Sequence, residues 1–146
     1  MKIEKLERVS IGVKNLAEAE KFFSDVFGLT FTKSPTDVKR ELLLNEPISD
    51  EHRAFIGKSR KASHSRIGLE LVEKDPPVAN EGVRVIYFKV DNLEAAKAEM
   101  KKKGIRLLHE EHVGKMRQAL YGPIFGCRID LVEYEGPSAL DAILRK

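Results

Sequence analysis

A short stretch of this sequence occurs twice in nearly the same form. Residues 13–23 read VKNLAEAEKFF and residues 90–100 read VDNLEAAKAEM, so that Leu16 and Leu93 correspond at an offset of 77 residues. In each copy an alternating stretch leads to an Asn, then to apolar residues at helical spacing, and then to a Gly. This order predicts a strand, a capped helix and a helix stop, repeated once.

In the first copy, RVSIGV over residues 8–13 alternates apolar and polar positions, which is typical of a half-buried strand. Asn15 is expected to cap the helix, with Glu18 completing a capping-box-like pair, and Gly28 is expected to end it. The helix carries an apolar stripe formed by Leu16, Ala19, Phe23, Val26 and Phe27.

The second copy repeats each step. VRVIYFKV over residues 83–90 predicts the strand, Asn92 the cap and Gly104 the helix end. The inward face of this helix is expected to be formed by Leu93, Ala96 and Met100.

Three short strands are expected after each helix. In the first half they are LTFT, part of HRAFIGKS, and RIGLELVE, and in the second half IRLLHEEH, KMRQALYG and CRIDLVEYE. Residues 33–50 are interpreted as a long loop and GKSRKASHSR, from Gly57, as a solvated hairpin turn. The chain is then one domain over 1–146, with a first module over about 5–74, a linker over about 75–81, a second module over about 82–135 and a C-terminal helix over about 137–145.

Composition limits the partners. Charged residues make up 34% of the chain with a net charge of +3. This mild bias favours an anionic small molecule and does not by itself indicate nucleic acid, which normally needs a clustered basic patch. The only cysteine is Cys127, which excludes an internal disulfide and fits a reducing cytoplasm. The first residues do not read as a signal peptide, and no stretch is apolar for long enough to span a membrane.

The duplicated βαβββ order resembles the vicinal oxygen chelate superfamily, which includes glyoxalase I, methylmalonyl-CoA epimerase, extradiol dioxygenases and bleomycin- and fosfomycin-resistance proteins. The resemblance covers nearly the whole chain and rests on SIGVKNLAEAEKFFSDVFGLTF, LELVE, GVRVIYFKVDNLEAAKAEMKKKGI and YGPIFGCRIDLVEYEG. It implies an α+β fold in which two tandem βαβββ modules form a curled eight-stranded sheet around a cup, with the helices outside. It also implies a homodimer, as in most relatives.

Metal-using relatives place four side chains in the cup: a His at the start of each module's first strand and a carboxylate or Gln in each last strand. Carried over to this chain, these positions fall on Arg8, Glu70, Val85 and Asp130. Both acids are present and both histidines are replaced. Arginine has no lone pair to give a metal, and valine has no donor atom.

The alternation of the strands also places Glu70 and Asp130 in the cup, because their apolar neighbours face the helices. The cup floor is then expected to hold Arg8, Ser10, Glu70, Val85, Tyr87, Lys89, Arg128 and Asp130.

Three interpretations of these charges stay open. In the favoured one, no metal binds, Arg8 takes its place, and Lys89 or Arg128 is left to meet an anionic ligand. In the second, Glu70 and Asp130 hold a divalent metal ion with the help of a histidine. The candidates for that histidine are His52, His64, His109 and His112. In the third, the charges form a structural ion pair without any ligand.

The resemblance implies a lyase or isomerase of the glyoxalase I or methylmalonyl-CoA epimerase type, acting on a small oxygenated anionic substrate. Glu70 and Asp130 are the expected acid–base pair, whose proximity would separate their pKa values. The expected ligand-binding residues are Arg8, Ser10, Val85, Tyr87, Lys89 and Arg128. The alternative is a non-catalytic, metal-free protein that sequesters a small molecule. An extradiol dioxygenase is disfavoured, since its iron site needs two histidines.

Overall fold

The computed structural model describes residues 1–33 and 59–144. The first module consists of β1 (Ile3–Gly12), α1 (Leu16–Phe27), β2 (Phe31–Lys33), β3 (Ser59–Ser65) and β4 (Leu69–Asp75). The second consists of β5 (Gly82–Val90), α4 (Leu93–Lys102), β6 (Leu107–Val113), β7 (Met116–Ile124) and β8 (Cys127–Glu133), and the helix α5 (Ala139–Leu144) follows it. The predicted order of strand, helix and three strands is confirmed in both halves.

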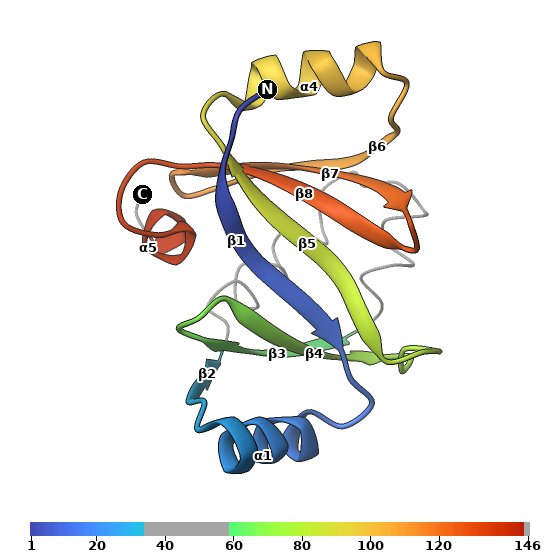
Figure 1. The fold of residues 1–146 in the computed structure, drawn as a ribbon, viewed down its shortest axis with the longest axis vertical. Coiled ribbons are helices and arrows are strands. Elements are labelled where there is room, and N and C mark those ends of the chain that lie inside the picture. The colour runs from blue at the N-terminus through green and yellow to red at the C-terminus, as the bar shows by residue number, and fades with distance from the viewer. Residues whose placement is uncertain (34–58, 145–146) are drawn as a thin grey trace.

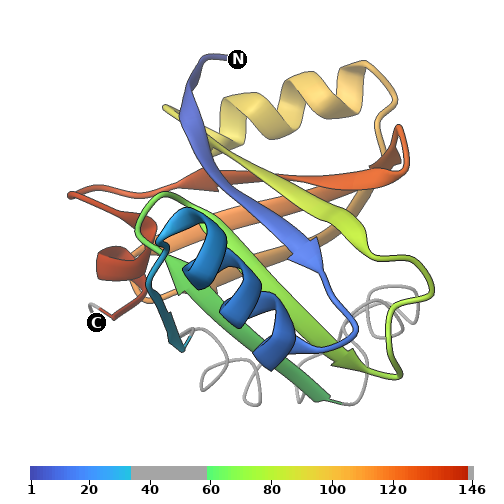
Figure 2. The ribbon, with the colours of Figure 1, turned by 60° about the horizontal axis from the view of Figure 1, so that its bottom comes forward.

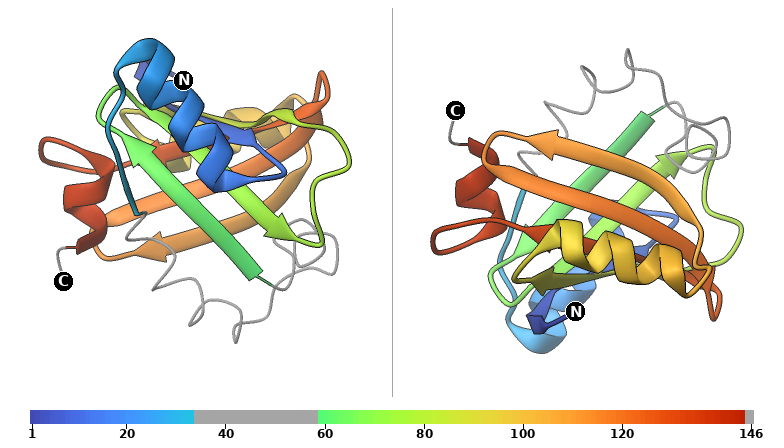
Figure 3. Two further views of the ribbon diagram at one scale, coloured as in Figure 1. Left: turned by 90° about the horizontal axis from the view of Figure 1, so that it is seen from below. Right: turned by 90° about the horizontal axis from the view of Figure 1, so that it is seen from above.

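The strands form one mixed eight-stranded sheet in the order β2-β3-β4-β1-β5-β8-β7-β6. The first strands of the two modules, β1 and β5, pair antiparallel in the middle, and each pairs in parallel with the last strand of its own module. The sheet curls without closing into a barrel, with α1 beyond β3 and β4 at one end and α4 over β7 and β8 at the other (Figure 1). Figures 2 and 3 show the same two helices on the outside of the sheet. The predicted fold class is therefore correct.

The repeated caps form as predicted. The side-chain oxygen of Asn15 accepts a hydrogen bond from the backbone N–H of Glu18, and that of Asn92 accepts one from Ala95, each at 3.0 Å. Gly28 adopts the left-handed conformation at the end of α1, with φ of 68°, which glycine reaches at little cost. Matched caps explain why two different sequences give two equivalent helices.

The two helices differ in how much of their apolar surface is covered. In α4 the predicted inward residues Leu93, Ala96 and Met100 are all buried. In α1 no residue is fully buried, and Val26 and Phe27 are 57% and 62% exposed. The C-terminal end of the apolar stripe of α1 is therefore exposed.

The described part of the segment from Gly57 forms a strand and not the solvated turn that its charges and serines suggest. Residues Ser59–Ser65 form β3, which pairs with β4 along its length. On its outer side Ser63 hydrogen-bonds Glu20 of α1, so Arg60 and His64 point to the opposite face. The predicted strand within residues 52–59 otherwise lies outside the described residues, as does most of the long loop over 33–50.

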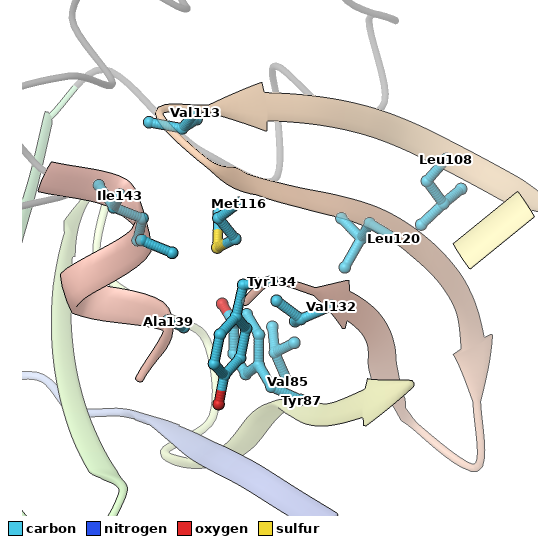
Figure 4. Close-up of a cluster of buried hydrophobic side chains, with 11 residues drawn as sticks. Val85, Tyr87, Leu108, Val113, Met116, Leu120, Val132, Tyr134, Ala139 and Ile143 are labelled. Atoms are coloured by element: carbon cyan, nitrogen blue, oxygen red, sulfur yellow. The ribbon is translucent and has the colours of Figure 1, made fainter. Parts of the chain in front are cut away.

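Two apolar cores lie on the two faces of the second module. The outer core packs α4 against the sheet and is formed by Val90, Leu93, Ala96, Met100, Ala119, Tyr121 and Leu131. The inner core packs α5 against the opposite face (Figure 4) and is formed by Val85, Tyr87, Leu108, Val113, Met116, Leu120, Val132, Tyr134, Ala139, Ala142 and Ile143. We call the face of the sheet opposite α1 and α4 the inner face.

The helix α5 is tied to the start of the chain. Glu7 accepts a hydrogen bond of 2.7 Å from the hydroxyl of Tyr134 and one of 3.4 Å from the backbone N–H of Ala139. This carboxylate sits at the first turn of α5, where a negative charge is favourable. Among the described residues, no helix is long and apolar enough to cross a membrane.

Candidate functional site

The inner face carries two rows of side chains that cross several strands in register. Residues paired side by side in neighbouring strands point to the same face. The first row consists of His64, Glu70, Ser10, Val85 and Arg128, on β3, β4, β1, β5 and β8. The second consists of Arg8, Tyr87, Asp130, Leu120 and His109, on β1, β5, β8, β7 and β6. The four positions carried over from metal-using relatives thus share one face.

Glu70 is the centre of a buried ion-pair cluster in the first module. Its side chain has no exposed surface. One oxygen, Oε1, lies 3.0 Å from Nη2 of Arg60, and the other, Oε2, lies 3.0 Å from Nε2 of His64 and 3.8 Å from Nη1 of Arg8. Nε2 of His64 is also 3.5 Å from Nη1 of Arg8. Two arginines and a histidine from two strands therefore converge on one carboxylate.

The charged groups in this cluster keep one another ionised. Burial by itself would raise the pKa of Glu70, but the positive charges of Arg8 and Arg60 and the hydrogen bond from His64 hold that pKa well below its usual range. Burial opposes the charge of Arg8 as well, yet Glu70, followed by Tyr87 and Asp130, raises the pKa of Arg8 above its ordinary value. The guanidinium and the carboxylate both stay ionised in the folded protein.

Arg8 joins the ion-pair cluster to the second module. Its guanidinium lies over the ring of Tyr87, 4.0 Å from the ring centroid, a cation–π contact. Tyr87 is paired with Asp130 across β5 and β8, and Asp130 is buried. The arginine is thus fixed on one side by an aromatic ring and on the other by a carboxylate.

The other predicted ligand-binding residues have different neighbours from those of Arg8. Val85 packs with Tyr87 in the inner core beneath α5, and Arg128 is paired with Val85 in the first row. Lys89 lies farther along β5, where its ammonium is 2.8 Å from Glu4 and 4.6 Å from the centroid of the Tyr134 ring. In the structure Glu4 pairs with the charge of Lys89, and the ligand-binding role of Lys89 stays a prediction.

Sequence reasoning missed Arg60 altogether and named His64 only as one of four possible metal ligands. It also missed a second polar cluster on β6 and β7. There Nε2 of His109 lies 3.2 Å from Oε1 of Glu111, whose other oxygen accepts a hydrogen bond of 2.7 Å from Gln118. The available signal is the even spacing of Arg60 and His64, which places both side chains on one face of a strand. Because both side chains are polar, this pattern is also typical of a solvated surface.

The side chains at the positions carried over from metal-using relatives do not fit a divalent ion. Arg8 stands at one ligand position with a charged group that cannot coordinate, and Val85 stands at another with a hydrocarbon. Oε1 of Glu70 already pairs with Arg60, and Oε2 lies beside His64 and Arg8. Within residues 1–33 and 59–144, no group of three or more His, Cys, Asp or Glu side chains is arranged to hold a metal ion.

The fold is a curled sheet of two βαβββ modules with charged side chains on its inner face. Residues 5–131 match the family described as the Glyoxalase/Bleomycin resistance protein/Dioxygenase superfamily, and the chain belongs to that family. No curated protein matches the sequence.

Several solved structures share the fold at low sequence identity. A Streptomyces coelicolor methylmalonyl-CoA epimerase variant in complex with 2-nitronate-propionyl-CoA is 18% identical, with a TM-score of 0.63 over 92% of this chain and 100% of that one. The Mycobacterium tuberculosis methylmalonyl-CoA epimerase is also 18% identical, with a TM-score of 0.63 over 92% and 90% of the two chains. A hypothetical protein from Bacillus halodurans gives 18% identity and a TM-score of 0.62 over 92% and 96%. At this level of sequence identity, the likeness to these structures shows the fold alone.

Proposed function

We propose that this protein is an isomerase or lyase that acts on a small anionic oxygenated compound, with Arg8 in the place of the family's metal ion. The observation that carries the proposal is the setting of Arg8. Its guanidinium is buried and charged, lies over Tyr87, and sits beside Glu70 at the position where metal-using relatives have a ligand. A fixed positive charge in such a site attracts an anion and stabilises negative charge that develops during reaction.

The reaction class follows from what such a charge can do. Removing a proton next to a carbonyl leaves an enolate, whose oxygen needs a positive partner or hydrogen-bond donors. A guanidinium supplies both in a rigid planar form and stays protonated at every working pH. The same charge that holds the substrate would therefore stabilise the intermediate.

The two carboxylates are proposed to have different roles. Glu70 has a pKa well below its usual range, and both of its oxygens are engaged, so it is a weak proton acceptor. Its proposed role is to position Arg8. Asp130, buried on the same face and next to Tyr87, is then the proposed acid–base residue.

A second candidate function is binding without catalysis, as in metal-free family members that sequester a small molecule. It is supported by the setting of Glu70, because a carboxylate that pairs with Arg60 and Arg8 leaves one acid fewer for proton transfer. Both candidates need an anionic ligand on the inner face, and they differ only in whether a carbon-bound proton is exchanged.

The deciding experiment is hydrogen exchange in D2O. The purified protein is incubated with a panel of small carboxylates and acyl-CoA thioesters, and deuterium uptake is followed by mass spectrometry, with binding measured by calorimetry. An isomerase or lyase gives exchange that persists after chelation and is lost in Asp130→Asn. Binding without exchange supports the sequestering function. If activity after chelation returns only with a divalent ion, the role given to Arg8 is overturned.

We also propose that the protein is a homodimer of the cytoplasm. The uncovered apolar residues at the end of α1 are suited to an interface between two copies, and the single cysteine fits a reducing compartment. Light scattering coupled to gel filtration gives the oligomeric state, and a monomer over the whole accessible concentration range would contradict the first proposal.

A further inference from the structure

The middle of the sheet carries apolar side chains on its outer side that are left open to solvent. Paired residues of neighbouring strands point to the same face, and Phe88 packs against the outer core. The side chains of β1 and β5 on this side form three registered pairs: Leu6 with Phe88, Val9 with Ile86, and Ile11 with Val83. We call these six residues the outer strip. None of them is buried, and Leu6 and Val83 are 56% and 48% exposed.

The neighbouring strands show where the cover of the outer side stops. Leu71 of β4, which pairs with Ile11, is fully buried beneath α1. Leu131 of β8, which pairs with Phe88, is 2% exposed beneath α4. Between these two positions β1 and β5 pass with no described helix over them (Figures 1 and 2). The outer strip is therefore the uncovered part of an otherwise covered apolar face.

The helix α1 has an exposed apolar flank beside the outer strip. Glu20 accepts a hydrogen bond from Ser63 and so marks the flank of α1 that faces β3. Phe22 and Val26 lie about 200° and 240° around the helix from Glu20, on the other flank, toward β4 and β1. They are 54% and 57% exposed. The ring of Phe22 stands edge-on to that of Phe23, with 5.6 Å between the ring centroids, so this flank is held in place by aromatic packing.

The dimensions of the outer strip match one α-helix. The strip is two strands wide, or about 10 Å, and packed helices lie about 8–10 Å apart. Its length from Leu6 to Ile11 is about 17 Å, and the twelve-residue helix α1 is about 18 Å long. Among the described helices, α4 and α5 pack apolar residues into the outer and inner cores, whereas α1 keeps an apolar flank exposed. The helix suited to the strip is therefore α1 of a second copy.

The exposed apolar area is sufficient for a stable dimer. Five side chains of the strip and of α1 are between 48% and 62% exposed: Leu6, Phe22, Val26, Phe27 and Val83. With roughly 150–200 Å² for a fully exposed large apolar side chain, they present about 400–550 Å² together. A standard interface buries about 800 Å² on each partner, of which about two thirds is apolar in homodimers, or about 500 Å².

We propose that two copies of this chain associate by placing α1 of each copy over the outer strip of the other. This inference rests on the proposed homodimer and names its contact surfaces, and it does not depend on the proposed reaction. A two-fold axis makes the two contacts equivalent, so each copy provides one helix flank and one strip. Phe22 is the aromatic residue at the centre of each contact, the kind of side chain enriched in the buried part of interfaces.

The first test is the dimer dissociation constant of Leu6→Glu and Phe22→Lys, measured by sedimentation equilibrium. Each variant places a charge in one of the two apolar surfaces, so Kd should rise about thirtyfold or more. Leu107→Glu and Phe125→Lys are the matched controls. They make the same replacements at residues that are 43% and 105% exposed and lie outside α1 and the outer strip, so their Kd should stay at the wild-type value.

The second test mixes the two variants. In a mixed dimer of Leu6→Glu and Phe22→Lys, one contact joins two unchanged surfaces, and the other brings the introduced lysine against the introduced glutamate. The Kd of the mixture should therefore be about tenfold or more below that of either variant alone. A contact of strip with strip, or of α1 with α1, gives no such gain.

The possible failures can be told apart. A wild type that is monomeric over the whole accessible concentration range overturns both the homodimer and this inference. If the wild type is dimeric and the two variants keep its Kd, or the controls weaken the dimer as much as the variants do, the inference fails and the homodimer stands. If both variants weaken the dimer and the mixture does not restore it, the pairing of α1 with the outer strip is overturned. Circular dichroism melts of each variant show that its copies remain folded.

Discussion

Replacing Glu70 by glutamine is expected to be severely destabilising, although it changes one oxygen to an amide nitrogen. The carboxylate has no exposed surface and pairs with Arg60 at 3.0 Å, His64 at 3.0 Å and Arg8 at 3.8 Å. In Glu70→Gln the two guanidinium groups remain buried and lose their counter-charge. Removing one partner of a buried ion pair in this way costs about 3–5 kcal/mol.

The size of the effect can be converted into a melting temperature. With an unfolding entropy of about 2.1 cal/mol/K per residue, a chain of 146 residues unfolds with about 0.3 kcal/mol/K. A loss of about 3–5 kcal/mol then lowers Tm by about 10–16 °C. Thermal melts followed by circular dichroism at neutral pH measure this shift, and urea unfolding gives the free energy separately.

Glu94→Gln is the matched control, since it removes the charge of a carboxylate that is 61% exposed and paired with Arg117. Exposed pairs are worth about 1 kcal/mol or less, so its Tm should change by no more than about 3 °C. The double variant with Arg8→Met should recover part of the stability lost in Glu70→Gln, because one uncompensated charge is gone. If Glu70→Gln melts as the control does, the buried ion-pair cluster does not stabilise the fold as argued here.

The remaining predictions concern pH, metal affinity, helix caps and α5. Because the pKa of Glu70 in the folded protein lies well below the value of about 4.3 in an unfolded chain, its ionised form stabilises the protein above about pH 4.5. That contribution is lost as the pH falls through the folded pKa, so the difference in Tm between wild type and Glu70→Gln should narrow in acid; a constant difference would contradict the pKa shift. Arg8→His should raise affinity for Zn²⁺ or Ni²⁺, seen by calorimetry, since it places an imidazole near Glu70 and His64, whereas Arg8→Gln should not. Asn92→Ala should lower the free energy of unfolding by about 1 kcal/mol in urea melts through loss of the cap of α4. Ile143→Ala, at a fully buried position of α5, should lower it by about 2–5 kcal/mol, and a change under about 1 kcal/mol would show that α5 does not pack on the inner face.

Much of the fold could be predicted because its signals are local. Asn15 and Asn92 each begin a helix by accepting a hydrogen bond three residues on, and Gly28 ends one by its left-handed backbone. These contacts depend on neighbours in sequence, so a linear pattern is enough to identify them. The likeness of the two copies then gave the duplicated order of strands.

The strand β3 could not be predicted, for a physical reason. Its inner side chains include Arg60 and His64, which are buried beside Glu70 of another strand. Periodicity identifies a strand by an apolar face, and the inner face of β3 is polar. The apolar pattern of α1 misleads in the opposite way, because Val26 and Phe27 recur at helical spacing and yet are exposed.

The sequence by itself determined the two-module architecture, the caps of both helices, and the presence of an arginine and a valine where metal-using relatives have histidines. Only the tertiary structure decided that Arg8 shares Glu70 with Arg60 and His64, that Glu4 pairs with Lys89, and that Val85 and α5 belong to one apolar core. Caps and alternation are set within a few residues, whereas the partner of a buried charge is chosen by strand register between segments far apart in the chain.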